Sequence, residues 1–251
     1  MSNFTMIKKL SMVTAGAALL AVGATVKAAN AASIINGGFE TGNFSGWTAV
    51  SQSGSNGNLF NTAGGRSPRS GSLIPGASEG TRYAVTDQSG PGSYVLFQDL
   101  FLEAGSQHKL SFDWFAQTGA RLSNPGNMNR NSFPNQQFRV DLVSTGFSNW
   151  FGSSSSAGVL ANIVAPTVLP RQWTSTTFDL SAWTGQTVRL AFRQADNQGY
   201  FQAGVDNVKI SSTPVEKVPE PASTLGLLAI GSMGAGSILK RKQQQKATVK
   251  A

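Results

Sequence analysis

Apolar and polar residues alternate in several short runs of this 251-residue chain. In residues 110–114 (LSFDW) every second residue is apolar, and residues 138–142 and 188–192 repeat the same period. A period of two places the apolar side chains on one face of a β-strand, so these runs predict half-buried strands. Helical periodicity is nearly absent from the middle of the chain. The pattern therefore favours an all-β fold.

Four less regular strands are expected at residues 82–86, 94–100, 173–180 and 205–210, with Gly, Asn, Ser and Pro clusters between them. Seven or more short strands separated by turn signals predict an antiparallel two-sheet β-sandwich, of either jelly-roll or immunoglobulin-like type. The chain has no cysteine, so this domain, assigned to residues 32–213, must be stabilised by its core.

The N-terminal residues have the features of an export signal. Lys8 and Lys9 precede an uncharged run over residues 10–26, and the small residues Ala29 and Ala31 suit a cleavage site. We therefore expect residues 1–31 to be a helical signal peptide that signal peptidase removes.

The C-terminal residues predict a membrane-spanning segment. Residues 214–221 form a linker that carries Pro219, Glu220 and Pro221, and residues 222–239 contain no charge. As a helix this run would span ~27 Å, about the hydrocarbon thickness of a bilayer. A buried core helix is the alternative, but the run has no polar face and contains four glycines.

A basic cluster, Lys240, Arg241 and Lys242, follows this run and opens a basic tail over residues 240–251. Basic residues stay in the cytoplasm, which places the domain on the outer side of the membrane.

This arrangement resembles the PEP-CTERM sorting signal of Gram-negative bacteria. The resemblance implies an exosortase-like processing protease as a partner, with transient residence in the inner membrane. It also implies a final location at the cell surface or in the extracellular matrix. The tail after the basic cluster is longer than usual for this signal.

The charge of the chain is concentrated in its ends. The whole sequence has a net charge of +8, whereas residues 33–213 contain 11 Lys and Arg against 10 Asp and Glu, a net of +1. The domain has no basic stripe with interleaved aromatic residues, so nucleic acid is not expected as a partner.

Three stretches of the domain, residues 35–48 (INGGFETGNFSGWT), 179–197 and 204–211 (GVDNVKIS), resemble the galactose-binding-like jelly rolls of many carbohydrate-binding modules. The resemblance favours the jelly-roll type of sandwich, flanked by the signal helix and the transmembrane sorting helix. Phe39, Trp47 and Trp183 are then expected to pack in the core.

In the resembling modules, a Glu after the Gly-Gly-Phe element and an Asp in the last strand often hold a structural calcium ion. Glu40 and Asp206 occupy these positions. Carboxylate and carbonyl oxygens are suitable ligands for Ca²⁺. The alternative is that Glu40 caps a turn and Asp206 binds the main chain or a basic neighbour.

Two loops are candidates for glycan binding. Residues 121–138 are rich in Asn and Gln, including Asn129 and Asn131, and residues 144–156 are expected to expose Trp150. Amides hydrogen-bond sugar hydroxyls and an exposed ring stacks on a pyranose, so we predict Trp150 first and Trp114 second as stacking residues. The alternative is a set of solvated turns with Trp150 folded back on a sheet edge.

Signals of catalysis are few. His108, the single histidine, is expected to be solvent-exposed at the start of a strand, and no pair of carboxylates stands out in the sequence. We therefore predict a non-catalytic exported surface or matrix protein that binds glycan. The alternatives are a matrix or adhesion protein without a sugar pocket, and a polysaccharide-active enzyme.

Overall fold

The computed structural model describes residues 32–153, 157–166 and 170–215. The predicted signal peptide, the Pro-Glu-Pro motif, the sorting helix and the basic tail lie outside the described residues. Within the described residues, no helix is long and apolar enough to cross a membrane.

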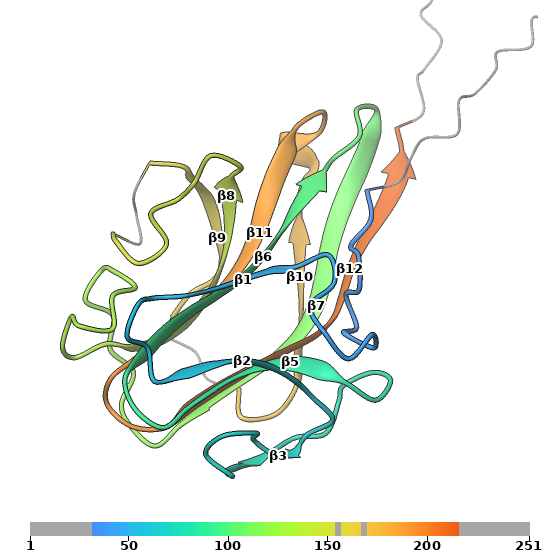
Figure 1. Cartoon of the computed structure of the whole chain (residues 1–251). Coiled ribbons are helices and arrows are strands. Elements are labelled where there is room, and N and C mark those ends of the chain that lie inside the picture. The colour runs from blue at the N-terminus through green and yellow to red at the C-terminus, as the bar shows by residue number, and fades with distance from the viewer. Residues whose placement is uncertain (1–31, 154–156, 167–169, 216–251) are drawn as a thin grey trace, which may run out of the picture. The chain divides into compact units, whose positions relative to one another are not determined.

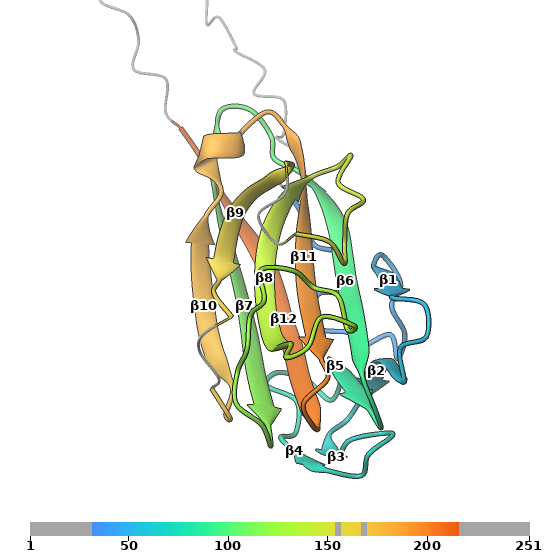
Figure 2. The ribbon, with the colours of Figure 1, turned by 90° about the vertical axis from the view of Figure 1, so that its left-hand side faces the viewer.

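Two five-stranded antiparallel sheets form a sandwich (Figures 1 and 2). The first sheet has the order β1 (Thr48–Ser51), β6 (Gly92–Phe101), β11 (Thr187–Asp196), β8 (Gln136–Ser144) and β9 (Val159–Val164). The second has the order β10 (Thr174–Asp179), β7 (Ser106–Thr118), β12 (Phe201–Pro214), β5 (Tyr83–Gln88) and β2 (Gly57–Thr62). From β5 to β8 the chain changes sheet at every step. The predicted all-β jelly-roll sandwich is confirmed, and all seven predicted strands are present.

Two small elements complete the described residues. The strands β3 (Gly65–Arg66) and β4 (Leu73–Ile74) pair with each other, and a 3₁₀-helix, η1 (Ser181–Trp183), precedes β11. Sequence periodicity did not predict β1, β2, β3, β4 or β9.

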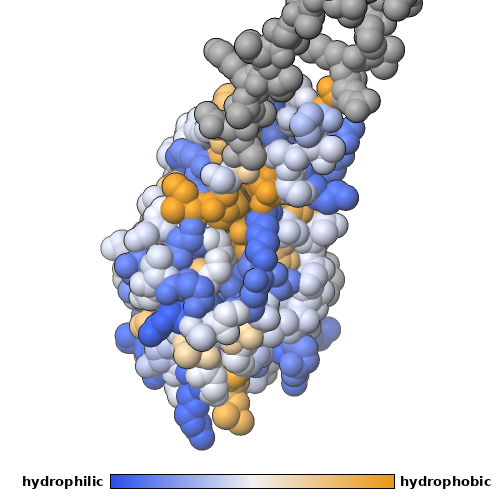
Figure 3. Space-filling model, turned by 90° about the vertical axis from the view of Figure 1, so that its right-hand side faces the viewer, coloured by the Kyte–Doolittle hydropathy of each residue, from blue (hydrophilic) through white to orange (hydrophobic). Residues whose placement is uncertain are grey.

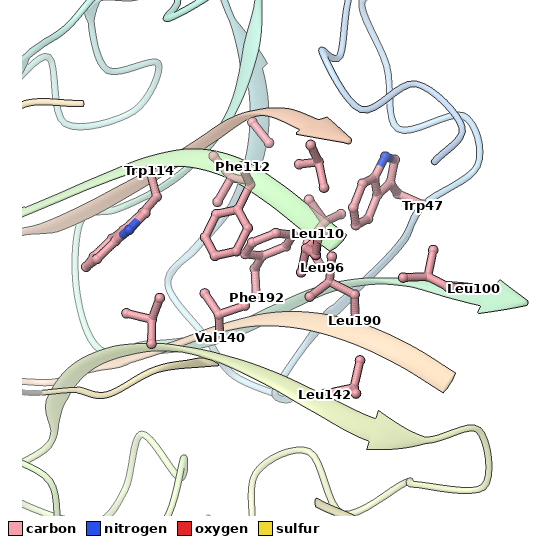
Figure 4. Close-up of a cluster of buried hydrophobic side chains, with 14 of the residues drawn as sticks. Trp47, Leu96, Leu100, Leu110, Phe112, Trp114, Val140, Leu142, Leu190 and Phe192 are labelled. Carbon is pink, nitrogen blue, oxygen red and sulfur yellow. The ribbon is translucent and has the colours of Figure 1, made fainter. Parts of the chain in front are cut away.

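The main core lies between the sheets (Figure 4). Alternate residues of β6, β7, β8 and β11 point inward, among them Leu96, Phe112, Val140 and Phe192, as the period-two runs predicted. Phe39 and Trp47 close one side of this core with 0% and 7% of their surface exposed, and Trp183 packs against it while partly exposed. These three packing predictions are confirmed.

The outer faces of both sheets are covered in part. Val95, Val143 and Ala191, which alternate with core residues, form a second cluster with Phe147 and Trp150 on the outside of the first sheet. Tyr83, Val85 and Phe115 form a third cluster with Ile74 on the outside of the second sheet. The prediction of half-buried strands is therefore wrong for β8, where eight of nine residues are buried.

The last strand, β12, runs the length of the sandwich. It pairs with β7 from Phe201↔Thr118 to Pro214↔Ser106, with one irregularity between Asp206 and Lys209. Fourteen residues of strand extend ~45 Å. Both ends of the described chain leave the sandwich at the end where β12 finishes (Figures 1 and 2).

The side of the molecule on the right in Figure 1 is mostly hydrophilic. Hydrophobic residues gather in the upper middle of this face, as Figure 3 shows. Polar atoms dominate the rest of this face, as expected for a domain whose apolar strand residues are already covered.

Gly204 of β12 tests how tightly the outer cluster of the second sheet is packed. A Cβ at this residue would lie 2.0 Å from Phe115 Cε1. The Phe115 ring makes edge contacts with Tyr83 and Trp173 and so cannot move aside freely. We expect Gly204→Ala to lower the free energy of unfolding by about 1–3 kcal/mol in urea titrations. Gly146→Ala, where a Cβ meets nothing within 4 Å, should change it by less than about 0.5 kcal/mol. Equal stability of the two variants would contradict this packing.

Candidate functional site

Trp150 is buried, not exposed as the sequence suggested. Only 8% of its surface is accessible, because the loop after β8 folds back over the first sheet. Its ring stacks on Phe97 with centroids 4.8 Å apart, and its carbonyl accepts a hydrogen bond from the Arg193 guanidinium. The expectation of an exposed stacking ring is therefore wrong, and the alternative of a ring folded back on the sheet describes Trp150 correctly.

Trp114 is equally unsuited to an open stacking site. It is 4% exposed, stacks on Phe138 inside the main core, and donates from Nε1 to Thr176 Oγ1 at 2.9 Å. Trp114 lies there because alternate residues of β7 point inward, and Phe112, two residues earlier, points the same way.

The Asn-rich loop uses much of its amide capacity internally. Asn129 Oδ1 accepts from Gln52 Nε2 and from the Asn131 main chain. Asn135 donates to the carbonyls of Asn127 and Asn129. These amides replace the main-chain pairing that an irregular loop lacks, as in a solvated turn. Neither Asn129 nor Asn131 lines the cavity described next, and their predicted contact with glycan remains a prediction.

Inward-facing residues become polar towards the end of the sandwich where β12 begins. Along β11 the same face carries Leu190, Phe192, Gln194 and Asp196 in turn. Gln194 Nε2 donates to Asp196 Oδ1 at 3.0 Å, and Gln194 Oε1 accepts from Thr86 of β5. At this end the inward-facing positions carry hydrogen-bonding side chains, whereas elsewhere on the same face they carry apolar side chains.

A cavity of about 320 Å³, here called the end cavity, opens at this polar end. It lies between the β5–β6 turn and the β11–β12 turn, and its volume is near the lower limit usual for ligand sites. Nine residues line it: Ser70, Gln88, Ser89, Gly90, Pro91, Asp196, Asn197, Gly199 and Tyr200.

Gln88 and two neighbours on β6 contribute polar atoms without partners. The Gln88 side chain is 2% exposed, and its Oε1 has no hydrogen-bond partner among the described residues, whereas its amide lies near enough to Asp196 to work against the rise in the pKa of that carboxyl. Ser93 Oγ and Tyr94 OH likewise have no partner within that part of the chain. Leaving a buried polar atom unpaired costs about 1–3 kcal/mol, so the Gln88 oxygen, which belongs to a lining residue of the end cavity, favours a polar guest there.

Asp196 is the single acidic residue among the nine that line the end cavity, and it is 1% exposed. Burial raises the pKa of its carboxyl to about 8, against the partial compensation of the hydrogen bond from Gln194. At neutral pH the group is therefore largely protonated.

Tyr200 forms an aromatic wall of the end cavity. The residue is 46% exposed, and a Cβ at Gly119 would lie 2.5 Å from Tyr200 Cε1, so the ring rests against the Gly119 backbone. A half-exposed ring in a fixed position beside polar groups is suited to stacking on a sugar face.

Sequence reasoning missed Gln88, Asp196 and Tyr200 as site residues. A signal was present in the parity of residues 188–196, because a strand that carries Leu190 and Phe192 inward also carries Gln194 and Asp196 inward. Following the alternation to the end of the strand would have located a buried acid.

Glu40 and Asp206 hold one loop, residues 78–82. Glu40 accepts hydrogen bonds from Thr81 and from the Arg82 main chain, which keep the pKa of its exposed carboxyl below the ordinary value. Asp206 accepts from the main chain of Ser78 and Glu79, while burial raises its pKa to about 6. The turn-capping and main-chain contacts named as the alternative are thus present.

The same residues were tested as a calcium cradle. A Cβ at Gly38 would contact Glu40 Cγ at 3.8 Å and Asp206 Oδ1 at 4.0 Å, so both side chains border this glycine. Asn207 Oδ1 is buried and has no partner among the described residues. Two carboxylates and a free amide oxygen fit a hard cation, although no three His, Cys, Asp or Glu side chains gather anywhere in the described chain.

His108 is buried, with 1% of its surface exposed, so the expectation of a solvent-exposed residue is wrong. Its Nε2 donates to the Glu103 carbonyl at 2.8 Å and its Nδ1 lies 2.8 Å from Ser212 Oγ. Both ring nitrogens therefore connect β7 to its neighbours.

The fold defined here is that of an all-β sandwich with a polar cavity at one end. Residues 217–242 match the model of the PEP-CTERM protein-sorting motif. This motif indicates export and sorting to the cell envelope or surface, and it implies processing by an exosortase. No curated protein matched the chain.

Solved structures with a similar fold include three of different kinds. TmCBM61 in complex with β-1,4-galactotriose is 16% identical with a TM-score of 0.45, covering 71% of this chain and 96% of that one. The K3 cleaved adhesin domain of Lys-gingipain from Porphyromonas gingivalis W83 is 20% identical with a TM-score of 0.44, covering 71% and 96%. A Stig cyclase from Fischerella sp. TAU is 19% identical with a TM-score of 0.44, covering 74% and 100%. Similarity at this level does not extend to ligand or activity.

Asp196→Asn tests the electrostatics of the end cavity. The carboxyl has a pKa of ~3.9 in an unfolded chain and about 8 in the fold, so the folded state binds the extra proton between these values. The stability of the wild type therefore falls as the pH rises from ~4 towards 8. Asn does not titrate, so the variant lacks this loss. In urea titrations its free energy of unfolding should rise relative to that of the wild type by roughly 4 kcal/mol between pH 5 and pH 9. Parallel pH profiles of the two proteins would contradict the buried neutral acid.

Proposed function

We propose that this chain is a non-catalytic exported protein of the cell surface or extracellular matrix and that its end cavity binds a glycan. The observation that carries the proposal is the meeting of two features in one cavity. Gln88 supplies a buried amide oxygen without a partner, and Tyr200 supplies a half-exposed aromatic ring. Sugars offer both hydroxyls for such an amide and an apolar face for such a ring.

The size and position of the end cavity favour one or two sugar units at a chain end. A volume of about 320 Å³ is small for a long oligosaccharide, and the cavity is bounded by two turns instead of lying along a sheet. The chain's own side chains cover the middle of each outer sheet face, which leaves less flat surface there for an extended polysaccharide.

The end cavity borders the opposite end of β12 from the end at which the chain continues to the sorting motif. The cavity borders the start of β12 at residues 199 and 200, whereas the sorting motif begins at residue 217, just beyond the other end of this strand. A domain tethered through its C-terminal residues would hold this cavity away from the tether.

Calcium is a second part of the proposal, as a structural ion held by Glu40, Asp206 and Asn207. The support is the placement of both acidic side chains around Gly38 and the unpartnered Asn207 oxygen. An ion there would fix the first loop of the domain to its last strand.

Tyr200→Ala tests glycan binding. A glycan array should first identify ligands of the wild-type domain, and calorimetry should then show about tenfold weaker binding by the variant because the stacking face is lost. Phe101→Ala is the matched control, since this ring is 57% exposed at the opposite end of β6 from the cavity. Strong self-association without glycan binding would favour an adhesion protein instead, and product release from polysaccharide would favour an enzyme.

Calcium titration tests the ion. We expect binding with a dissociation constant of about 0.1–1 mM, as in extracellular modules, and a higher melting temperature in calcium. Asp206→Ala should abolish both effects, and Glu40→Gln should weaken them while leaving a similar side-chain shape. Asp99→Ala, a surface control on β6, should retain both effects. Absence of heat on calcium addition to the wild type would exclude the site.

A further inference from the structure

We propose that the end cavity selects glycans that carry a free primary ammonium group, such as a deacetylated hexosamine, with Asp196 as the partner of the ammonium. This inference rests on the proposed function, and it specifies the chemical class of the ligand.

The charges that line the end cavity are the first step. Asp196 is the one ionisable acid among the nine lining residues, and none of the nine is basic. Among the described residues, Asp99, Asp141 and Glu79 form ion pairs, whereas Asp196 forms none. A carboxyl without a counter-charge in a buried place is unusual, because an amide would fill the same space at lower cost.

The acceptors around Asp196 are the second step. An ammonium group has three N–H donors and no acceptor. Asp196 and Gln88 are lining residues of the cavity and Gln88 Oε1 is an unpartnered oxygen, while Tyr94 OH is a further unpartnered oxygen that lies outside the lining but close enough to Asp196 to feel its charge. An Asp196 carboxylate oxygen and these two oxygens match the three donors in number. The exposed Tyr200 ring adds an aromatic face that attracts cations.

The other charged groups near the cavity are already engaged. Asp87 of β5 accepts from Arg69, Ser70 and Gln202. Arg69 binds Asn56 and Ser89, and Arg130 binds the Ser53 carbonyl. Tyr94 of β6 stays neutral, because burial raises its pKa further above the ordinary value. Neither arginine forms an ion pair with Asp196. An ammonium group that enters the cavity would therefore be the first cation to pair with this carboxylate.

The proton balance distinguishes this ligand from a neutral sugar. Below pH 8 Asp196 is mainly a neutral acid. When an ammonium binds, the carboxyl O–H bond breaks, the proton passes to the buffer, and the carboxylate pairs with an ammonium that keeps its three protons. A neutral sugar leaves the acid protonated and releases no proton. An anionic sugar meets no cation in the cavity lining and is disfavoured.

The experiment compares three β-1,4-linked tetrasaccharides on the whole folded domain by calorimetry: glucosamine, N-acetylglucosamine and glucose. Measurements at pH 6 keep the amines charged, and two buffers of different ionisation enthalpy report protons released. We expect the glucosamine form to bind about tenfold or more tightly than the other two, with the release of close to one proton. Asp196→Asn should remove both the preference and the proton release. Asp99→Asn, a surface acid at the other end of β6, should change neither.

The outcomes separate the two proposals. Equal binding of all three sugars without proton release, or the same preference in Asp196→Asn, would overturn the ammonium site and leave glycan binding in place. Tighter binding of an acidic sugar would also overturn it. No binding of any glycan, here and on the array, would overturn the proposed function itself.

Discussion

The central strands of this sandwich are largely buried on both faces, whereas edge strands such as β10 keep exposed residues. The main core fills the space between the sheets, while loop residues such as Phe147 and Trp150 cover the outside of the first sheet and Ile74 the outside of the second. Polar residues under such a cover must be paired with each other. Asp141 Oδ2 accordingly forms ion pairs with Arg139 Nε at 2.7 Å and with Arg193 Nη1 at 2.9 Å. The covered part of each sheet is closed to ligands, and the cavity proposed to bind a glycan lies at one end of the sandwich.

The polar end of the interior follows from strand parity. Each strand keeps its inward face along its whole length, so the same face of β11 that contributes Leu190 and Phe192 to the core also carries Gln194 and Asp196 inward. Hydrogen bonds join several of these groups across the sheets, as between Thr86 and Gln194 or Gln136 and Thr118. The network stops short of the Gln88 amide oxygen, which remains without a partner in the described part of the chain. The end cavity is where this buried polarity reaches the surface.

The sequence predicted what depends on local periodicity. Alternation identified the central strands, and the large aromatics Phe39 and Trp47 were assigned correctly to the core. Trp150 was assigned wrongly because the composition of a loop does not tell which sheet face the loop covers. Asn129 illustrates the same limit, since its amide looks available for a ligand but accepts from Gln52, which lies 77 residues away in sequence. Asp196 was overlooked because its burial depends on β5 and β6 closing over it. Contacts between distant segments thus decide the site, whereas local pattern decides the strands.

Sorting and recognition are mechanically separable in this fold. The sorting motif begins at residue 217, and every residue that lines the end cavity lies between 70 and 200. The strand β12 connects the two regions and is held by twelve register pairs to β7, with further pairs to β5. A cut after residue 215 removes none of these pairs, so removal of the sorting signal leaves the cavity walls intact. Because the cavity is built by turns at one end and the chain departs at the other, the protein can be processed without disturbing the groups that would recognise a ligand.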